Sequence, residues 1–174
     1  MNPRVKNMIY CSMFACIIAI LAQIKIDLPS LVPITLQTLG IYLISCYLKP
    51  KLAFISTVVY LFMGIIGLPV FTGFKGRRTF FIHMNVPPTG GYIFSFPIMV
   101  SITSLIINKN KTLFFKILAM IIGTIVCYLI GTLWFIFITN NSFVLALSMC
   151  VIPFIPGVGF KIAITLILSN KIKI

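Results

Sequence analysis

Few residues of this chain could carry out acid–base chemistry. Asp27 is the only carboxylate side chain among its 174 residues, and His83 is the only histidine. Hydrolysis and group transfer usually need a carboxylate, a histidine or a metal held in a site, so these two residues leave almost no material for a catalytic pair. The stretch GFKGRR at residues 73–78 also lacks the spacing of a phosphate-binding loop. We therefore expect a protein that is not an enzyme and has no ATPase of its own.

Positive charge gathers between Phe71 and Tyr92. This segment holds Lys75, Arg77 and Arg78, in a chain whose formal net charge is +13. Nucleic acid is one anionic partner for such charge, but a nucleic-acid-binding protein would not also be 60% hydrophobic. Membrane lipid is the favoured anionic partner. The basic cluster itself is either a solvated loop that touches lipid headgroups or part of a ligand site.

The five cysteines show no metal-ligand spacing. Most lie inside apolar runs, where a thiol packs as a small hydrophobic group. They are Cys11, Cys16, Cys46, Cys127 and Cys150. We predict that the protein uses no metal and no cofactor.

Composition predicts an all-α integral membrane protein. The mean hydropathy is +1.17 and 9% of the residues are charged, while several apolar runs approach the roughly 17 to 25 residues that cross a bilayer. We expect one membrane domain over residues 1–174, built as a bundle of six transmembrane helices. The predicted segments are about 7–24, 31–48, 52–67, 90–107, 112–138 and 142–169, the last with a Pro/Gly break near 153–157.

The first segment follows the basic stretch MNPRVKN, as the apolar part of a signal peptide would. Its apolar run is longer than that part of a signal peptide, and no clear cleavage site follows it. We expect this segment to remain in the mature protein as a transmembrane helix.

Charge also predicts how the bundle is oriented. Six crossings place both termini on one side of the membrane, and that side carries nine basic residues, so the positive-inside rule makes it cytoplasmic. The nine are Arg4, Lys6, Lys49, Lys51, Lys109, Lys111, Lys116, Lys171 and Lys173. The outer side then holds Lys25, the basic cluster and Lys161.

Several sequence blocks match one family in order, over nearly the whole chain. They are AQI at 22–24, VPITLQTL at 32–39, GLPVFTG at 67–73, PTGGYIFSF at 88–96, and PFIPG at 153–157 followed by Lys161. The chain resembles the BioY-type biotin-binding S components of energy-coupling factor (ECF) transporters, and TLQT and PTGGY are the most specific matches. The resemblance implies a six-helix bundle with cytoplasmic termini that binds biotin from the outer side.

The resemblance also implies which residues bind the substrate. Hydroxyl and amide groups of the TLQT block would lie at the outer end of the second segment, where they could bond a ureido ring or a carboxylate. Tyr92 offers a flat apolar face and one hydroxyl. Simple helix capping by Thr35 and an interfacial position for Tyr92 are the alternatives. The expected substrate-binding residues are Thr35, Gln37, Asn85, Thr89, Tyr92 and Lys161.

Lys161 is a basic residue inside an apolar helical run. A lysine at membrane depth is costly and is therefore a functional candidate, although its stem could instead snorkel to the outer interface. The family pattern has a lysine at this position and usually an aspartate three residues before it, where this chain has Val158. Because that acidic residue is missing, we expect the basic cluster Lys75, Arg77 and Arg78 to close over the ligand's carboxylate as a lid.

Small residues recur every four positions on the first segment. Ser12 and Cys16 form one such pair, and Ala15 and Ala19 form another. This spacing lets two helix backbones approach closely. In the resembled family an AxxxA face contacts the transmembrane coupling protein, so Ala15 and Ala19 are expected to have that role. Packing inside the bundle is the alternative.

These inferences combine into one functional hypothesis. The chain is expected to be the S component of an ECF vitamin transporter in the bacterial plasma membrane. It would bind biotin and deliver it through a transmembrane coupling protein, the T component, and two cytoplasmic ATPases. A sister component for riboflavin or thiamine, or a membrane scaffold protein without a small ligand, remains the alternative.

Overall fold

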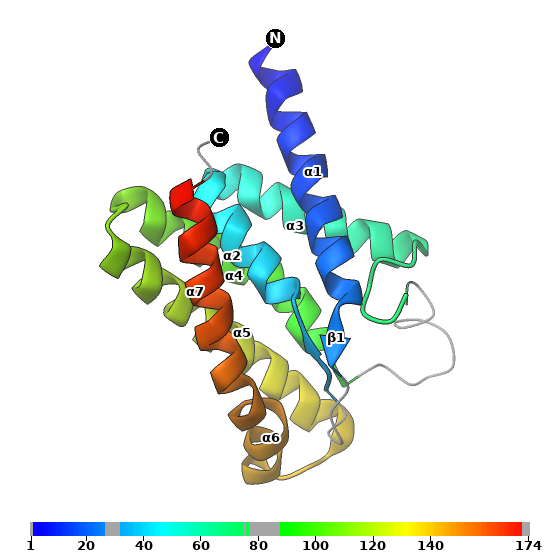
Figure 1. Ribbon diagram of the computed structural model, residues 1–174. Coiled ribbons are helices and arrows are strands. Elements are labelled where there is room, and N and C mark those ends of the chain that lie inside the picture. The colour runs from blue at the N-terminus through cyan, green and yellow to red at the C-terminus, as the bar shows by residue number, and fades with distance from the viewer. Residues whose placement is uncertain (1, 27–31, 75, 77–87, 172–174) are drawn as a thin grey trace.

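The computed structural model describes residues 2–26, 32–74, 76 and 88–171. Most of these residues are helical (Figure 1), so the all-α prediction is confirmed. The elements are α1 (Pro3–Gln23), β1 (Lys25–Ile26), β2 (Ile34–Thr35), α2 (Gln37–Tyr47), α3 (Pro50–Ile66), α4 (Gly90–Lys109), α5 (Leu113–Thr139), α6 (Phe143–Cys150), the 3₁₀ turn η2 (Ile152–Phe154) and α7 (Ile155–Lys171).

Four helical segments in the described part are long and apolar enough to cross a membrane. They are α1, α4, α5 and the interrupted segment Phe143–Lys171. Helix α3 is a shorter apolar helix of 17 residues, and α2 has 11. The helical character of all six predicted segments is confirmed, whereas six complete crossings stay a prediction.

The second helix begins later than predicted. Ile34 and Thr35 form β2, which pairs with β1 in an antiparallel arrangement that sets Lys25 opposite Thr35. Pro33 has no backbone N–H, and the β-branched residues after it favour extended backbone. Helix α2 therefore starts at Gln37, and the predicted helix is wrong for residues 32–36. Its predicted first residue, Leu31, lies outside the described residues.

The last helix resumes earlier than predicted. The interruption covers Val151 and η2, and α7 begins at Ile155. Pro156 fits in the first helical turn because the N–H groups of that turn have no helical partner in any case. The predicted break near 153–157 is therefore wrong in its second half, because residues 155–157 are already helical.

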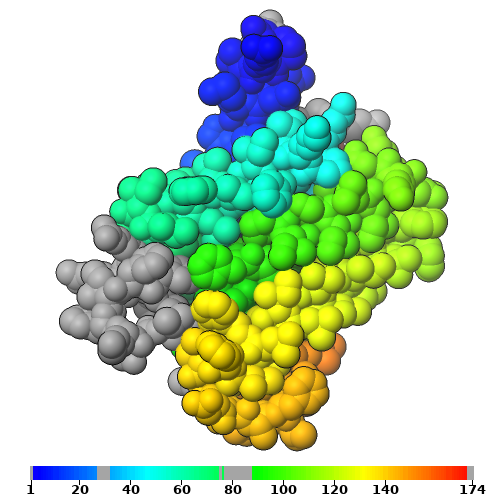
Figure 2. All heavy atoms as spheres, turned by 180° about the vertical axis from the view of Figure 1, so that it is seen from behind, coloured from blue at the N-terminus to red at the C-terminus, as the bar shows by residue number. Residues whose placement is uncertain are grey.

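Helix α4 packs against α5, α3 and α2. Figure 2 shows α3, α4 and α5 side by side across one face of the molecule, in cyan, green and yellow. Helix α2 in turn packs against α1 and α7 (Figure 1). The N-terminal half of α1 projects beyond the other helices in both views, which leaves apolar side chains such as Met8 and Ile9 exposed.

Most buried hydroxyl groups in the core are satisfied within their own helix. Ser45 donates to the carbonyl of Ile41 at 2.9 Å, and Thr103 donates to the carbonyl of Met99 at 2.8 Å. Such bonds to the preceding turn need no partner from elsewhere. Buried polar groups that reach across helices are a different class, and they define the candidate site.

Candidate functional site

Lys161 lies inside the bundle at the contact between α7 and α2. Its side chain is only 6% exposed, and its ammonium donates a hydrogen bond to Oγ1 of Thr38 at 2.9 Å. Helices α2 and α7 pack together, which brings into contact two residues that are 123 positions apart. The alternative of a lysine that snorkels to the interface does not fit so buried a side chain.

Among the described residues, the ammonium of Lys161 has fewer hydrogen-bond partners than it has donors. An ammonium group carries three donors, and Thr38 is the partner that the described residues provide. Asp27, the only carboxylate side chain of the sequence, lies outside those residues. A buried cation with one neutral partner is unfavourable unless a further acceptor or anion joins it.

Gln37 is the first residue of α2 and is 4% exposed. Its Oε1 accepts hydrogen bonds from the hydroxyl of Thr35 at 3.0 Å and from that of Thr72 at 3.3 Å. Its Nε2 donates to Oη of Tyr60 at 2.6 Å. Leu36 is the N-cap residue of α2, and no side chain caps it. The alternative in which Thr35 caps this helix is therefore wrong.

The first turn of α2 thus holds two polar side chains with different partners. Gln37 holds an amide, and the next residue, Thr38, binds the Lys161 ammonium. Thr35, Gln37 and Lys161 are all predicted substrate-binding residues, and the structure connects all three to this turn. Tyr60 and Thr72 were missed. A polar side chain inside the apolar run of α3 was the signal that could have indicated Tyr60.

The PTGGY block forms the start of α4. Thr89 is its N-cap residue and makes no side-chain capping bond. A Cβ atom at Gly91 would lie 2.2 Å from Cβ of Trp134, so only glycine lets α4 and α5 approach this closely here. Tyr92 is half-buried, and its hydroxyl is 3.3 Å from that of Thr132.

Tyr92 belongs to an aromatic cluster that sequence analysis did not identify. Its ring meets that of Tyr128 edge to face at 6.4 Å, and Tyr128 meets Phe154 in the same way at 6.4 Å. The cluster joins α4, α5 and η2. Helices α5 and α7 pack together, and Tyr92 packs against the core cluster that holds Cys127 of α5 and Ile162 of α7. The aromatic cluster therefore lies beside the part of α7 that carries Lys161.

Some predicted site residues lie outside the described part of the chain. These are Asn85 and the basic cluster of Lys75, Arg77 and Arg78. Their roles as a substrate contact and as a lid therefore stay predictions. Val158, which stands where the family usually has an aspartate, is half-buried and packs against the main hydrophobic core.

The small residues of α1 divide between two sides of the helix. Ala15 is fully buried and belongs to the main core cluster, and Ala19 is half-buried against it. Ser12 and Cys16 are exposed. In this chain alone, Ala15 thus packs inside the bundle. The small residues that α1 exposes are Ser12, Cys16 and, in part, Ala19.

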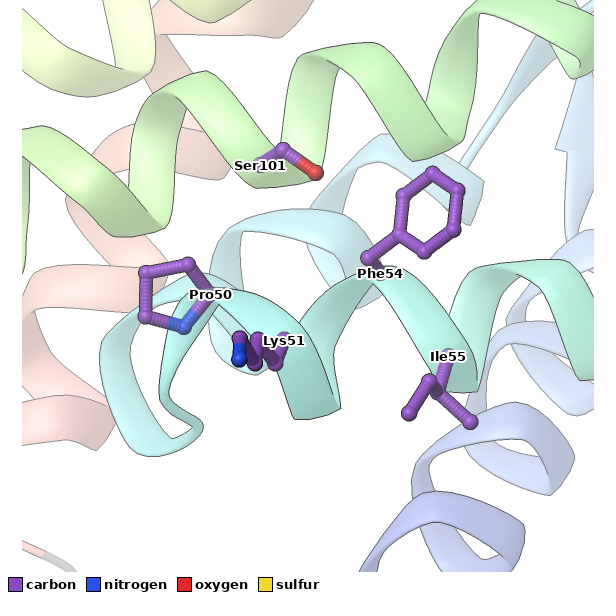
Figure 3. Close-up of a pocket in the computed structure, with 5 residues that line it drawn as sticks. All are labelled: Pro50, Lys51, Phe54, Ile55 and Ser101. Atoms are coloured by element: carbon purple, nitrogen blue, oxygen red, sulfur yellow. The ribbon is translucent and has the colours of Figure 1, made fainter.

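A groove on the outside of the bundle runs between α3 and α4 (Figure 3). Figure 3 shows Phe54 of α3 pointing toward α4, where Ser101 lies. The lining residues are Pro50, Lys51, Phe54, Ile55 and Ser101. None of the predicted substrate-binding residues is among them, so this groove is separate from the candidate site.

Comparison with known proteins decides the family. The BioY family model matches residues 1–174. The chain belongs to the BioY family. Similar BioY relatives include the probable biotin transporter BioY of Pyrococcus horikoshii, which is 33% identical over 172 residues and is matched over 98% of each chain. Biotin transporter BioY2 of Lactococcus lactis subsp. cremoris is 35% identical over 156 residues, or 88% of this chain and 82% of the relative.

A solved structure has the same fold as this BioY-family chain. It is described as the S-component for biotin from an ECF-type ABC transporter, and it matches with a TM-score of 0.84 at 28% identity. The match covers 98% of this chain and 92% of that one. The family recognised from the sequence blocks is thereby confirmed. Because the BioY relatives are named as transporters, the predictions of a non-enzymatic, multi-pass membrane protein are confirmed as well.

Proposed function

We propose that this chain is the biotin-binding S component of an ECF-type ABC transporter and that biotin binds between α2, α5 and α7. The observation that carries the proposal is the buried ammonium of Lys161, which has one neutral hydroxyl, that of Thr38, as its partner among the described residues. Such a group calls for a ligand that brings an acceptor or an anion. Family membership and the structural match support the same assignment.

Biotin has the chemical features that this site lacks. It carries a carboxylate at the end of an aliphatic chain and a ureido group at the other end, so it offers acceptors for Lys161 and for the remaining N–H of Gln37. Its apolar ring system suits a surface made of aromatic side chains. Tyr92, Tyr128 and Phe154 provide such a surface. Thr35 and Thr89 are proposed to complete the polar contacts, with Asn85 and the basic cluster from outside the described residues.

The proposed partners are a T component and two cytoplasmic ATPases. The exposed side of α1 is the proposed contact for the T component, because Ser12, Cys16 and Ala19 would allow close helix approach. The projecting apolar surface around Met8 adds area that either a partner or lipid can cover. Ala15 itself is buried, so we assign the expected contact with the T component to the exposed small residues beside it.

The proposed orientation places both termini in the cytoplasm, with six crossings. Long-range hydrogen bonds bring together the helix ends that carry the basic residues: Tyr47 donates to the carbonyl of Leu168 at 3.0 Å, and Lys116 donates to Ser169 at 3.3 Å. A basic end of this kind belongs on the cytoplasmic side. In a cysteine-free background, an impermeant thiol reagent added outside should label Asn140→Cys and leave Lys111→Cys unlabelled.

A panel of vitamins tests the proposed function. Purified protein in detergent should melt at a higher temperature with biotin, because a ligand that binds only the folded state stabilises it by mass action. Riboflavin and thiamine should leave the melting temperature unchanged. A shift with one of those two vitamins alone would identify a sister component. No shift with any of the three would favour a scaffold protein.

A further inference from the structure

Gln23, the last residue of α1, holds the turn that follows α3. Its Nε2 donates to the carbonyls of Val70 and Phe71, each at 3.3 Å, and to that of Ala19 at 3.1 Å. Its Oε1 accepts from the backbone N–H of Phe74 at 2.9 Å. Figure 1 shows this end of α1 beside the segment that leaves α3. One amide thus bonds to both ends of the turn formed by residues 70–74.

The turn needs such support because its backbone is unusual. Gly73 has φ of +74° and Phe74 has φ of +56°, and the left-handed region is unfavourable for a residue such as Phe. Phe71 anchors the other side of the turn, since its ring is buried and meets Tyr60 edge to face at 5.5 Å. The turn is therefore connected to α1 through Gln23 and to α3 through the contact of Phe71 with Tyr60.

A chain of hydrogen bonds connects this turn to the candidate site. The carbonyl of Val70 accepts from Gln23 and also from Oη of Tyr60, at 3.3 Å in each case. Because the Tyr60 hydroxyl gives its only hydrogen to Val70, it must accept the N–H of Gln37. That fixes the direction of the Gln37 amide, so its Oε1 faces Thr35 and Thr72.

We propose that Gln23 is a positioning residue for substrate binding, which sets the Gln37 amide through Val70 and Tyr60. The inference rests on the proposed function, in which Gln37 contacts biotin. Gln23 combines donors for two carbonyls of the turn with an acceptor for Phe74 in a side chain of the required length. Leucine has neither donor nor acceptor, and glutamate keeps only the acceptor.

A double-mutant cycle separates this role from a merely structural one. Biotin affinity is measured by calorimetry on purified full-length protein. Gln23→Leu should weaken binding about tenfold, the upper range for a hydrogen bond between neutral groups. In a Gln37→Leu background the same change should weaken binding less than about twofold, because a residue that acts only through Gln37 then has nothing left to position. In a Lys161→Ala background, Gln23→Leu should weaken binding by the same factor as in wild type.

Further variants guard against a folding defect. Gln23→Glu keeps the side-chain length and the bond to Phe74, and Tyr60→Phe keeps the buried ring, so both should fold and weaken binding in the same direction. Asn108→Leu is the matched control, because that amide bonds to Ser104 within α4, and it should bind biotin as wild type does.

The outcomes distinguish the inference from the proposed function. Wild-type affinity in Gln23→Leu, or an equal loss with and without Gln37, would overturn the positioning role alone. Wild-type protein that fails to bind biotin would overturn the proposed function and this inference with it.

Discussion

The polar contact between α2 and α7 and the exposed side of α1 are opposite kinds of surface in one molecule. Lys161 is 6% exposed and bonds to Thr38 across two helices. Met8, near the start of α1, is 69% exposed and is apolar. The proposed account assigns the first region to the substrate and the second to a protein partner, so each must be recognised by a different physical signal.

In a chain whose solvent is lipid, polarity is the stronger signal. A buried ammonium or amide is costly without a partner, so its position indicates where a ligand or a network must be. An exposed apolar side chain is satisfied by lipid as well as by protein, so exposure alone says little about α1. The spacing of small residues is what distinguishes a helix contact there.

Removing the buried charge should have the largest effect on the polar region. Lys161→Ala is expected to weaken biotin binding by more than tenfold, because losing a buried charge-assisted bond costs on the order of 2 to 5 kcal/mol. The protein should remain folded. Lys116→Ala is the control, since that lysine also bonds to a single hydroxyl, at 3.3 Å, but toward the other ends of the helices. Equal affinity in wild type and Lys161→Ala would show that Lys161 does not contact biotin.

Larger side chains on α1 should have different effects on its buried side and on its exposed side. Ala15→Leu is expected to destabilise the fold by roughly 1 to 3 kcal/mol, because Ala15 is fully buried and a well-packed core has no room for a larger side chain. Cys16→Leu, on the exposed side, should leave the melting temperature and biotin binding unchanged. It should still abolish ATP-driven uptake in cells that contain the coupling module. Normal uptake by Cys16→Leu would place the partner elsewhere.

Blocking the carboxylate of biotin should show which end of the ligand Lys161 meets. If the ammonium binds the carboxylate, biotin methyl ester should bind wild type about tenfold or more weakly, in line with loss of a charged hydrogen bond. The affinity of the ester for Lys161→Ala should then be close to its affinity for wild type. If the ammonium binds the ureido oxygen, acid and ester should lose affinity by similar factors in that variant.

The hydroxyl beside Lys161 should have the smallest effect. Thr38→Val keeps the shape of the side chain but removes the bond to the ammonium, so it should change biotin affinity by about tenfold at most, equivalent to roughly 0.5 to 1.5 kcal/mol. Thr38→Ser restores the hydroxyl and should restore the affinity. A loss in Thr38→Val that Thr38→Ser does not reverse would point to packing rather than to hydrogen bonding.

Sequence reasoning found Lys161 because a charge inside an apolar run is anomalous without any knowledge of its neighbours. It also found the six helical segments, which depend on local composition. It did not find Tyr60 as a partner of Gln37, since that contact depends on how α2 and α3 pack. The helix starts at Gln37 and Ile155 were misplaced because proline both interrupts a helix and begins one, and only the three-dimensional context decides which.

A structure of the complex with biotin would locate the ligand relative to Lys161. We expect biotin between α2, α5 and α7, with one of its oxygen atoms at hydrogen-bond distance from Nζ of Lys161, roughly 2.7 to 3.2 Å. The apolar part of the ligand should contact the aromatic cluster of Tyr92, Tyr128 and Phe154. Biotin bound in the groove between α3 and α4, or with no polar atom near Lys161, would contradict the account.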